Sequence, residues 1–289
     1  MKTRKMTSVL IALAMSFALF AGCSKKDADS GDNTFITIKG SDTMAHLVAS
    51  WAEEFGKSNT GIDVSFTGGG SGTGIAAILN GTTDICAASR EVKDKEIKQA
   101  NDKGITLTEL VVARDGIAVI VNPANPVNEM TIEQIGKIYT GATPNWSTVG
   151  GVDMPVEILS RESSSGTYSF FQDVVLNKKD YAVSAKLMPA TSAIVQAVTE
   201  NKGAIGYVGL GYALAAKGKV KIIAVKADAS TPAVVPSDAS IKEGTYSVAR
   251  GLQFYTNGEP TGNIKKFLDY CLSSAGQKIV QETGYVVVK

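Results

Sequence analysis

Short runs of β-branched and apolar residues alternate with helical patterns along most of this 289-residue chain. Residues 35–38 and 63–67 are predicted strands, and helices are expected from about Met44 and from about Gly74. Strands that alternate with helices are joined by crossovers, which place helices on the faces of a largely parallel sheet. The sequence therefore predicts α/β layers.

The middle of the chain marks the start of a second unit. Residues 109–113 and 116–121 form two apolar runs, which predict a strand or a strand pair that leaves the first unit. Thr131 with Gln134 three positions later is a capping-box pattern ahead of periodic isoleucines, so a helix is expected to begin there.

The last third of the chain continues the same alternation. Residues 203–207 and 221–225 are predicted strands, and the polar stretch 226–244 is predicted to be a loop. An amphipathic helix near the C-terminus is indicated by apolar residues at helical spacing. These residues are Ile264, Phe267, Leu268 and Cys271.

The N-terminus is typical of a secretory signal peptide, predicted over residues 1–22. Lys2, Arg4 and Lys5 precede an apolar run at 9–20, which is shorter than the roughly 20 residues a membrane span needs. Cys23 follows Ala21 and Gly22 directly, in a pattern that resembles a bacterial lipobox. The alternative is a plain small-residue cleavage site, because Phe20 stands where a smaller aliphatic residue is usual.

Residues 23–33 are short, polar and charged, and they are predicted to tether a folded domain to the lipid on Cys23. Cys86 and Cys271 lie in apolar patterns, which favours two buried thiols over a disulfide. An exported protein keeps the disulfide open as an alternative.

The composition argues against several classes of function. The chain carries 29 basic and 28 acidic residues without basic runs, which speaks against a nucleic-acid-binding protein. His46 is the only histidine and is expected at a helix surface or cap. No Ser-His-Asp set and no metal-ligand cluster can be assembled without His46, so neither an enzyme nor a cofactor is predicted. Carboxylate-only chemistry stays open as an alternative, but no spacing recommends it.

Two loops rich in glycine and hydroxyl residues lie between a strand and a helix. They are residues 68–74 (GGGSGTG) and 161–167 (RESSSGT), and residues 40–44 (GSDTM) form a third candidate. Free N–H groups at a helix start, without a Cβ in the way, bind anions. Arg161 adds a guanidinium group that can donate two parallel hydrogen bonds to an oxyanion. The alternative role for Arg161 is a surface salt bridge with Glu162.

A second glycine pattern inside the first loop is weak evidence for a dinucleotide site. Residues 72–77 match the dinucleotide fingerprint G-x-G-x-x-A after a strand. That fingerprint does not explain the loop at 161–167, and an exported protein rarely meets a free nicotinamide cofactor. An anion site is therefore the preferred interpretation.

Together these segments resemble the phosphate-binding proteins of phosphate ABC transporters (PstS-type), a branch of the periplasmic-binding-protein superfamily. The resemblance spans about 34–288 and rests on the three loops and on further landmarks. Those landmarks are residues 84–90, 138–141, Asn145 with Trp146, and 203–207.

The resemblance implies a type II periplasmic-binding-protein fold, with two α/β lobes joined by two crossing strands and phosphate held between them. Lobe I is expected over 34–114 and 246–289, and lobe II over 115–245. The resemblance also implies an extracytoplasmic monomer, anchored to the membrane by lipid, that delivers inorganic phosphate to ABC permease subunits. Its implied phosphate contacts are Thr43, Met44, Ser71, Arg161, Ser165, Gly166 and Thr167, to which we add Ser89 and Arg90.

One departure concerns selectivity. Many relatives place an aspartate after Ala-Ser to accept the proton of hydrogen phosphate, whereas this chain has Arg90 after Ser89. A hydroxyl, a backbone carbonyl or Asp84 could replace that acceptor. The alternatives to a phosphate receptor are a receptor for sulfate, molybdate or a phosphonate, an exported phosphoester hydrolase, and a surface sensor on the same fold.

Overall fold

The structure is a computed structural model that describes residues 34–288. The predicted signal peptide and tether, with the predicted lipidation site Cys23, lie outside the described residues. No helix within 34–288 is long and apolar enough to cross a membrane.

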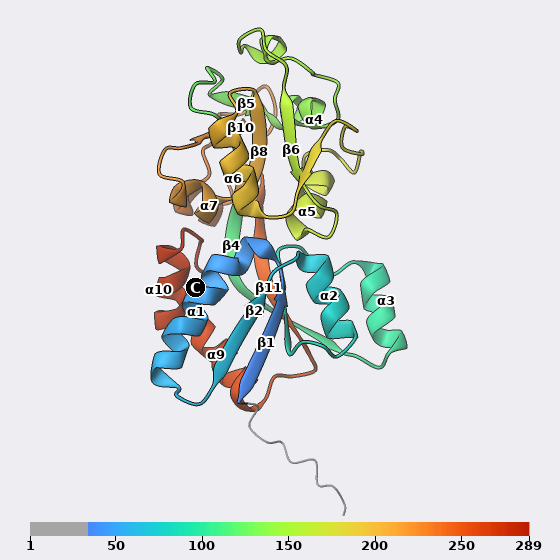
Figure 1. Cartoon of the computed structure of the whole chain (residues 1–289), viewed down its shortest axis with the longest axis vertical. Helices are drawn as coiled ribbons and strands as arrows, with labels where there is room; N and C mark the ends of the chain where they lie inside the picture. The colour runs from blue at the N-terminus through green and yellow to red at the C-terminus, as the bar shows by residue number, and fades with distance from the viewer. Residues whose placement is uncertain (1–33, 289) are drawn as a thin grey trace, which may run out of the picture. The chain divides into compact units, whose positions relative to one another are not determined.

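Within residues 34–288, nine strands form one continuous mixed sheet with the order β2-β1-β3-β11-β4-β8-β6-β7, and β9 pairs with β4. A separate two-stranded sheet joins β10 to β5. The outer strands are parallel to their neighbours, whereas β4 and β11 are antiparallel to theirs. β4 (Leu107–Val121) and β11 (Ala249–Asn257) run between two groups of helices (Figure 1).

We call the part of the molecule around β1, β2 and β3 lobe I. Its strands are β1 (Phe35–Gly40), β2 (Asp63–Thr67) and β3 (Ile85–Ala88). Its helices are the 3₁₀ turn η1 (Asp42–Met44), α1 (Ala45–Ser58), α2 (Ser71–Leu79), α3 (Asp94–Asp102), α9 (Gly262–Leu272) and α10 (Ser274–Glu282).

The part around β6, β7 and β8 is lobe II. Its strands are β5 (Glu129–Thr131), β6 (Glu157–Arg161), β7 (Lys186–Met188), β8 (Ala204–Gly209), β9 (Lys221–Ile222) and β10 (Ala224–Lys226). Its helices are α4 (Ile132–Tyr139), the 3₁₀ turn η2 (Trp146–Val149), α5 (Gly166–Val174), α6 (Thr191–Glu200), α7 (Leu210–Ala215) and α8 (Asp238–Lys242).

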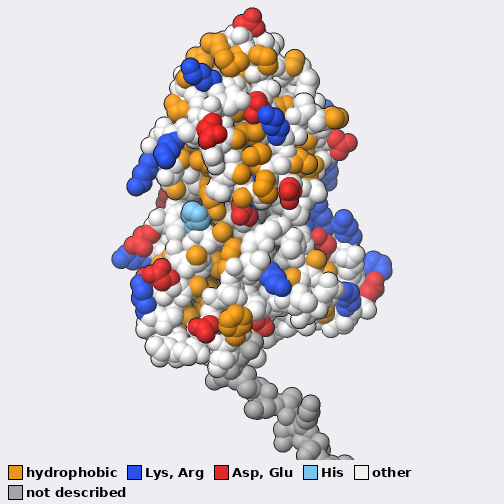
Figure 2. Space-filling view, in the orientation of Figure 1, with side chains coloured by type: hydrophobic (Ala, Val, Ile, Leu, Met, Phe, Trp, Pro, Cys, Tyr) orange, Lys and Arg blue, Asp and Glu red, His pale blue; other side chains and the backbone are white. Residues whose placement is uncertain are grey.

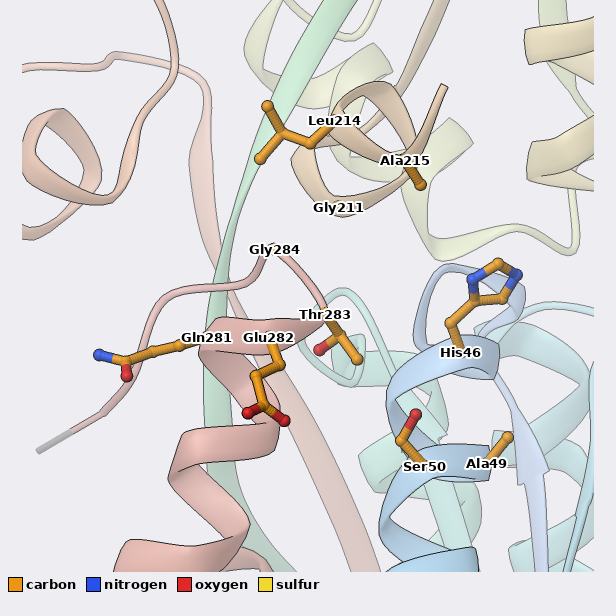
Figure 3. Close-up of a pocket in the computed structure, with 10 residues that line it drawn as sticks. All are labelled: His46, Ala49, Ser50, Gly211, Leu214, Ala215, Gln281, Glu282, Thr283 and Gly284. Atoms are coloured by element: carbon orange, nitrogen blue, oxygen red, sulfur yellow. The ribbon is translucent and has the colours of Figure 1, made fainter. Parts of the chain in front are cut away.

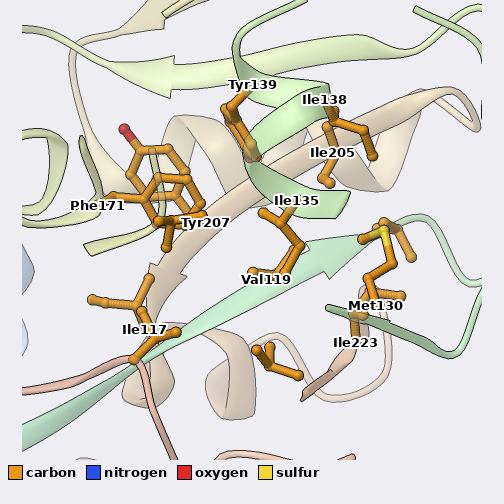
Figure 4. Packing of buried hydrophobic residues seen from close by; sticks show 14 of the residues in the cluster. Ile117, Val119, Met130, Ile135, Ile138, Tyr139, Phe171, Ile205, Tyr207 and Ile223 are labelled. Atoms are coloured by element: carbon orange, nitrogen blue, oxygen red, sulfur yellow. The ribbon is translucent and has the colours of Figure 1, made fainter. Parts of the chain in front are cut away.

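Each lobe has its own apolar core. In lobe I, Trp51, Phe55 and Phe267 pack against the sheet. In lobe II, Phe171 of α5 and Tyr207 of β8 stack with ring centroids 4.0 Å apart, next to Tyr139 of α4 (Figure 4). The buried apolar clusters of the two lobes are separate, and two strands connect the lobes, which is an arrangement typical of a hinge.

Two local patterns predicted from the sequence are present in the structure. Thr131 and Gln134 form the predicted capping box at α4, with both reciprocal hydrogen bonds present. The stripe predicted from Ile264 to Cys271 lies on α9, where Phe267, Leu268 and Cys271 are buried.

Three local predictions were wrong in detail. The second helix begins at Ser71 rather than near Gly74. The run 221–225 is divided between β9 and β10, which join different sheets. The predicted loop 226–244 contains α8, because Ser237 and Ser240 form a capping box there.

The cysteines and the strands between the lobes were also predicted from the sequence. Cys86 and Cys271 are free and buried, as predicted. The two apolar runs at 109–121 form one strand, β4, rather than a pair. The boundary predicted between residues 114 and 115 falls inside β4, and the one between 245 and 246 precedes β11.

Candidate functional site

Buried polar side chains gather between the lobes, where the parallel strands of both lobes end. Ligands of open α/β sheets bind at such carboxyl ends. The segments that follow β1, β2, β3, β6 and β7 supply most of the polar groups, the end of β6 supplies two more, and the crossing strands β4 and β11 supply the rest. The buried side chains are Ser41, Thr43, Ser71, Ser89, Asp115, Ser160, Arg161, Ser165, Thr167, Thr191 and Arg250.

Lobe I contributes a cluster of three serine hydroxyls. Ser41 Oγ donates to Ser89 Oγ at 2.8 Å, and Ser71 Oγ accepts the backbone N–H of Ser89 at 3.0 Å. The chain enters α2 through Gly70, whose φ of 100° favours glycine. A Cβ on Gly70 would also lie 2.5 Å from the carbonyl oxygen of Ser164 in lobe II. The glycine loop therefore brings the first turn of α2 against the other lobe.

Met44 lies at the edge of this cluster. Its side chain is fully buried in the lobe I core, and its N–H donates to the carbonyl of Ser41 at 3.0 Å. Met44 can therefore offer the cluster only its backbone N–H, and that N–H already donates to Ser41.

Lobe II contributes the first turn of α5 and a buried arginine. Ser165 caps α5, and its Oγ accepts the N–H of Tyr168 at 3.3 Å. The guanidinium of Arg161 donates to Thr191 Oγ1 at 2.7 Å and to two backbone carbonyls. Burial lowers the pKa of Arg161, and the negative charge of Asp42, 3.4 Å away, opposes that shift. Arg161 is therefore a buried cation within the cluster, not a surface partner of Glu162.

The two lobes touch directly at this cluster. Thr43 Oγ1 and Thr167 Oγ1 lie 2.8 Å apart, and the N–H of Thr191 donates to Asp42 Oδ2 at 2.7 Å. A Cβ on Gly166 would lie only 2.2 Å from Ser71 Oγ. The structure is therefore a closed arrangement in which the two lobes' polar groups face each other.

Arg90 is held by a carboxylate of its own lobe. Its two terminal nitrogens donate to the two oxygens of Glu96 at 2.9 and 2.8 Å. Burial would raise the pKa of Glu96, but the hydrogen bonds from Arg90 and from the N–H of Lys93 outweigh burial and lower it. The structure thus gives Arg90 a bidentate partner on α3.

Sequence reasoning missed two residues, Arg250 and Asp115, which lie on the crossing strands. Arg250 donates to the carbonyl of Ser89 at 2.7 Å and to Thr167 Oγ1 at 3.0 Å. It also pairs with Asp115 Oδ2 at 3.0 Å and lies over the ring of Phe170. A signal for both was available in the sequence, because each is a charged residue inside an apolar pattern. Arg250 lies in such a pattern at 249–256, and Asp115 lies between the apolar runs 109–113 and 116–121.

Asp115 and Arg250 influence each other's ionisation. Burial lowers the pKa of Arg250 and raises the pKa of Asp115, and the opposite charge of each residue opposes the shift of the other. A buried pair of this kind leaves an unpaired charge when either partner is removed.

Two residues considered in the sequence lie outside the cluster. Asp84 accepts the N–H and the hydroxyl of Thr37 at the start of β3, roughly 16 Å of strand from Ser89. Asp84 therefore cannot replace the missing acceptor. His46 is exposed on α1, as predicted, and lies against the ring of Tyr212.

Two grooves flank the lobe junction. One groove, between α1, α7 and the end of α10, has a volume of about 610 Å³. Its lining residues, drawn in Figure 3, include His46 but none of the predicted site residues. The other, of about 740 Å³, is lined by both Arg90 and Arg250. On the face shown in Figure 2, acidic and basic side chains are interspersed. Within residues 34–288 no group of three or more His, Cys, Asp or Glu side chains is arranged to hold a metal ion.

Comparison with known proteins gives consistent matches. Residues 25–275 match the model of the PBP superfamily domain. The phosphate-binding protein PstS of Staphylococcus saprophyticus is 34% identical over 284 residues, covering 96% of this chain and 88% of that protein. The protein SphX of Synechococcus elongatus is 34% identical over 266 residues, covering 89% and 78%.

Solved structures agree with these sequence matches. A phosphate ABC transporter substrate-binding protein from Clostridium perfringens, with bound phosphate, has a TM-score of 0.80 at 30% identity and covers 88% of this chain and 100% of that chain. An ABC-type phosphate transport receptor from Vibrio cholerae has a TM-score of 0.70 at 30% identity, covering 87% and 99%.

Two α/β lobes, joined by crossing strands and enclosing a buried polar cluster, define the class of two-lobe solute-binding proteins. The relatives narrow that class further. This chain belongs to the PBP superfamily and, within it, to the PstS-type family of phosphate-binding proteins.

Proposed function

We propose that this protein binds inorganic phosphate between its lobes and delivers it to an ABC importer. The observation that carries the proposal is the buried interlobe cluster, in which hydroxyls of both lobes meet around two buried arginines. Hydroxyls, helix-start N–H groups and guanidinium groups are the donors that a tetrahedral oxyanion requires. Relatives named as phosphate-binding proteins support the same ligand.

The proposed phosphate contacts come from both lobes. Lobe I would offer hydroxyls and backbone N–H groups, and lobe II would offer Arg161 and the first turn of α5. Arg90 remains in the set as a prediction, and its guanidinium would have to leave Glu96 to reach the anion. The proposed contacts are Thr43, Met44, Ser71, Ser89, Arg90, Arg161, Ser165, Gly166 and Thr167.

Binding is proposed to couple to lobe closure. Only a closed arrangement brings Ser71 of lobe I and Gly166 of lobe II close enough for one ligand to contact both. A ligand that contacts both lobes binds the closed form more tightly, so it shifts the equilibrium toward closure. An importer can then distinguish loaded from empty receptor by the relative position of the lobes.

We propose a binding protein rather than an enzyme. His46 is the only histidine of the chain and is exposed against Tyr212, so it does not lie beside the buried serines. A serine nucleophile needs an adjacent base. Release of phosphate from a phosphoester by the pure protein, abolished by a change in the cluster, would revive the hydrolase alternative.

The location is proposed from the N-terminal sequence. A signal peptide over 1–22 and acylation of Cys23 would hold a monomer at the extracytoplasmic face of the membrane through the tether 23–33. Such an anchor leaves the folded part free to approach permease subunits.

The test is isothermal titration of the mature protein, purified in detergent and freed of endogenous anion, with phosphate and then with sulfate at neutral pH. We expect phosphate to bind with a dissociation constant of about 1 μM or lower, which corresponds to about −8 kcal/mol or stronger. Binding of sulfate or molybdate instead would make the protein a receptor for another oxyanion. Binding of none of these anions would overturn the proposal.

A further inference from the structure

Charged side chains are rarely buried, so those that are buried here mark the places where the fold requires charge. Among residues 34–288, Arg90, Arg161 and Arg250 are the buried basic residues, and Asp115 is the buried acidic one. The terminal nitrogens of Arg90 pair with Glu96, although its Nε, like that of Arg250, has no hydrogen-bond partner among the described residues. Arg250 and Asp115 remain to be explained.

Arg250 reaches into the cluster from β11 and links both lobes. One terminal nitrogen donates to Ser89 in lobe I, and the other donates to Thr167 in lobe II. Its side chain is only 3% exposed, and its Nε is a buried donor without a hydrogen-bond partner among the described residues. A buried donor without a partner costs free energy that an additional acceptor in the cluster would recover.

Asp115, on the neighbouring strand β4, pairs with the guanidinium of Arg250. Its Oδ2 accepts from Arg250 and its Oδ1 accepts the N–H of Leu210 at 3.1 Å. A carboxylate has about four lone-pair positions, so two remain. A Cβ on Gly209 would lie 3.0 Å from both Asp115 Oδ2 and Thr43 Cγ2, which places the carboxylate beside the side chain of Thr43.

We propose that Arg250 and Asp115 form the part of the site that selects a protonated oxyanion. Arg250 donates to an unprotonated oxygen of the anion, and Asp115 accepts a hydrogen bond from a P–OH group. This inference rests on the proposed function and names its selectivity. It assigns to Asp115 the acceptor role that the position after Ser89 cannot fill, because Arg90 occupies it.

The physical reason lies in the protonation of the competing ions. Phosphate at neutral pH carries at least one proton and can donate it in a hydrogen bond to a carboxylate. Sulfate carries none, so a sulfate oxygen would face a buried carboxylate with two acceptors in contact. A site rejects a competitor most strongly where it leaves such groups unpaired.

The experiment compares phosphate and sulfate affinities of the full mature protein with those of Asp115→Asn and Arg250→Gln. The side-chain amide introduced by Asp115→Asn can donate to a sulfate oxygen. We expect Asp115→Asn to lower phosphate affinity at least tenfold and to raise sulfate affinity at least tenfold. Arg250→Gln should weaken phosphate at least tenfold without creating sulfate binding.

The controls separate selectivity from folding. Arg114→Gln changes an exposed arginine next to Asp115 on the same strand, and both affinities should stay within twofold. Each variant is checked by circular dichroism and thermal melting. If Asp115→Asn does not fold, the double variant Asp115→Asn/Arg250→Gln removes both charges, and its phosphate-to-sulfate ratio should fall at least a hundredfold.

Failure of this inference differs from failure of the proposed function. If the unaltered protein binds phosphate and Asp115→Asn keeps its phosphate-to-sulfate ratio, then Asp115 only positions Arg250 and the selectivity proposal is wrong. An equal loss of both affinities would have the same meaning. If the unaltered protein binds no phosphate, the proposed function itself fails.

Discussion

Thr43 Oγ1 and Thr167 Oγ1 lie 2.8 Å apart although 124 residues separate them, and they belong to different lobes. In the closed structure one of these hydroxyls donates to the other, and Arg250 donates to Thr167 as well. Such a contact brings together two groups that the sequence places in separate loops. It also indicates which hydroxyls an anion between the lobes would meet.

Thr167→Val should weaken phosphate binding at least tenfold, about 1.4 kcal/mol. Valine keeps the shape of threonine but removes the hydroxyl, so the anion loses one hydrogen bond and Arg250 loses an acceptor. Titration calorimetry measures the change. Thr199→Val, in the last turn of α6, is the matched control and should bind normally. Unchanged affinity of Thr167→Val would show that this hydroxyl does not contact the ligand.

Gly166→Ala should prevent full closure. The added methyl group would lie 2.2 Å from Ser71 Oγ and 2.7 Å from Ser89 Oγ, distances at which one lobe must move away. We expect at least a tenfold loss of phosphate affinity and no decrease in the radius of gyration when phosphate is added, measured by small-angle X-ray scattering. Gly56→Ala, with no atom within 4 Å of the new Cβ, serves as the control and should close normally.

Arg161→Ala should lower phosphate affinity at least tenfold, about 1.4 kcal/mol, because it removes a buried cation from the cluster. Arg161→Lys keeps the charge but loses the fork that reaches Thr191 and two carbonyls, so it should recover only part of the affinity. Full affinity in Arg161→Ala would mean that the residue serves only the packing of lobe II.

Cys86 and Cys271 should resist thiol reagents in the folded protein. Both are buried, and burial raises the pKa of Cys86 to about 12, so the reactive thiolate is scarce at neutral pH. In the Cys23→Ala variant, which retains these two cysteines, Ellman's reagent should detect no thiol before denaturation and two afterwards. Rapid reaction of a native thiol would contradict the buried positions.

Cys23→Ala should release the protein from the membrane. If the thiol of Cys23 carries the lipid, the variant loses its anchor and appears in the soluble fraction after cell fractionation. Unaltered Cys23 protein should partition into the detergent phase of Triton X-114. Continued membrane association of the variant would remove the lipoprotein proposal.

The sequence was sufficient for the local structure where short-range chemistry decides it. The capping box of Thr131 and Gln134, the stripe of α9 and the alternation of strands and helices all depend on neighbours within a few residues. Where two sheets compete for one run, as at 221–225, local pattern could not separate β9 from β10.

The same distinction applies to the candidate site. Glycine, hydroxyl and arginine residues in two strand-to-helix loops were enough to predict an anion site, because helix starts present free N–H groups wherever they occur. The partners of the charged side chains were not predictable. Arg90 pairs with Glu96, while Arg250, on a strand whose bounds were not predicted from the sequence, reaches Ser89 and Thr167.

The sequence by itself determined the α/β class, the loops that carry the donors and the two free cysteines. Only the tertiary structure decided which charges meet, because the pairs are long-range: Arg250 lies 135 residues from Asp115, and Thr43 lies 124 residues from Thr167. Contacts between distant segments depend on how β4 and β11 cross between the lobes. That crossing is a property of the assembled sheet, and no local pattern of residues encodes it.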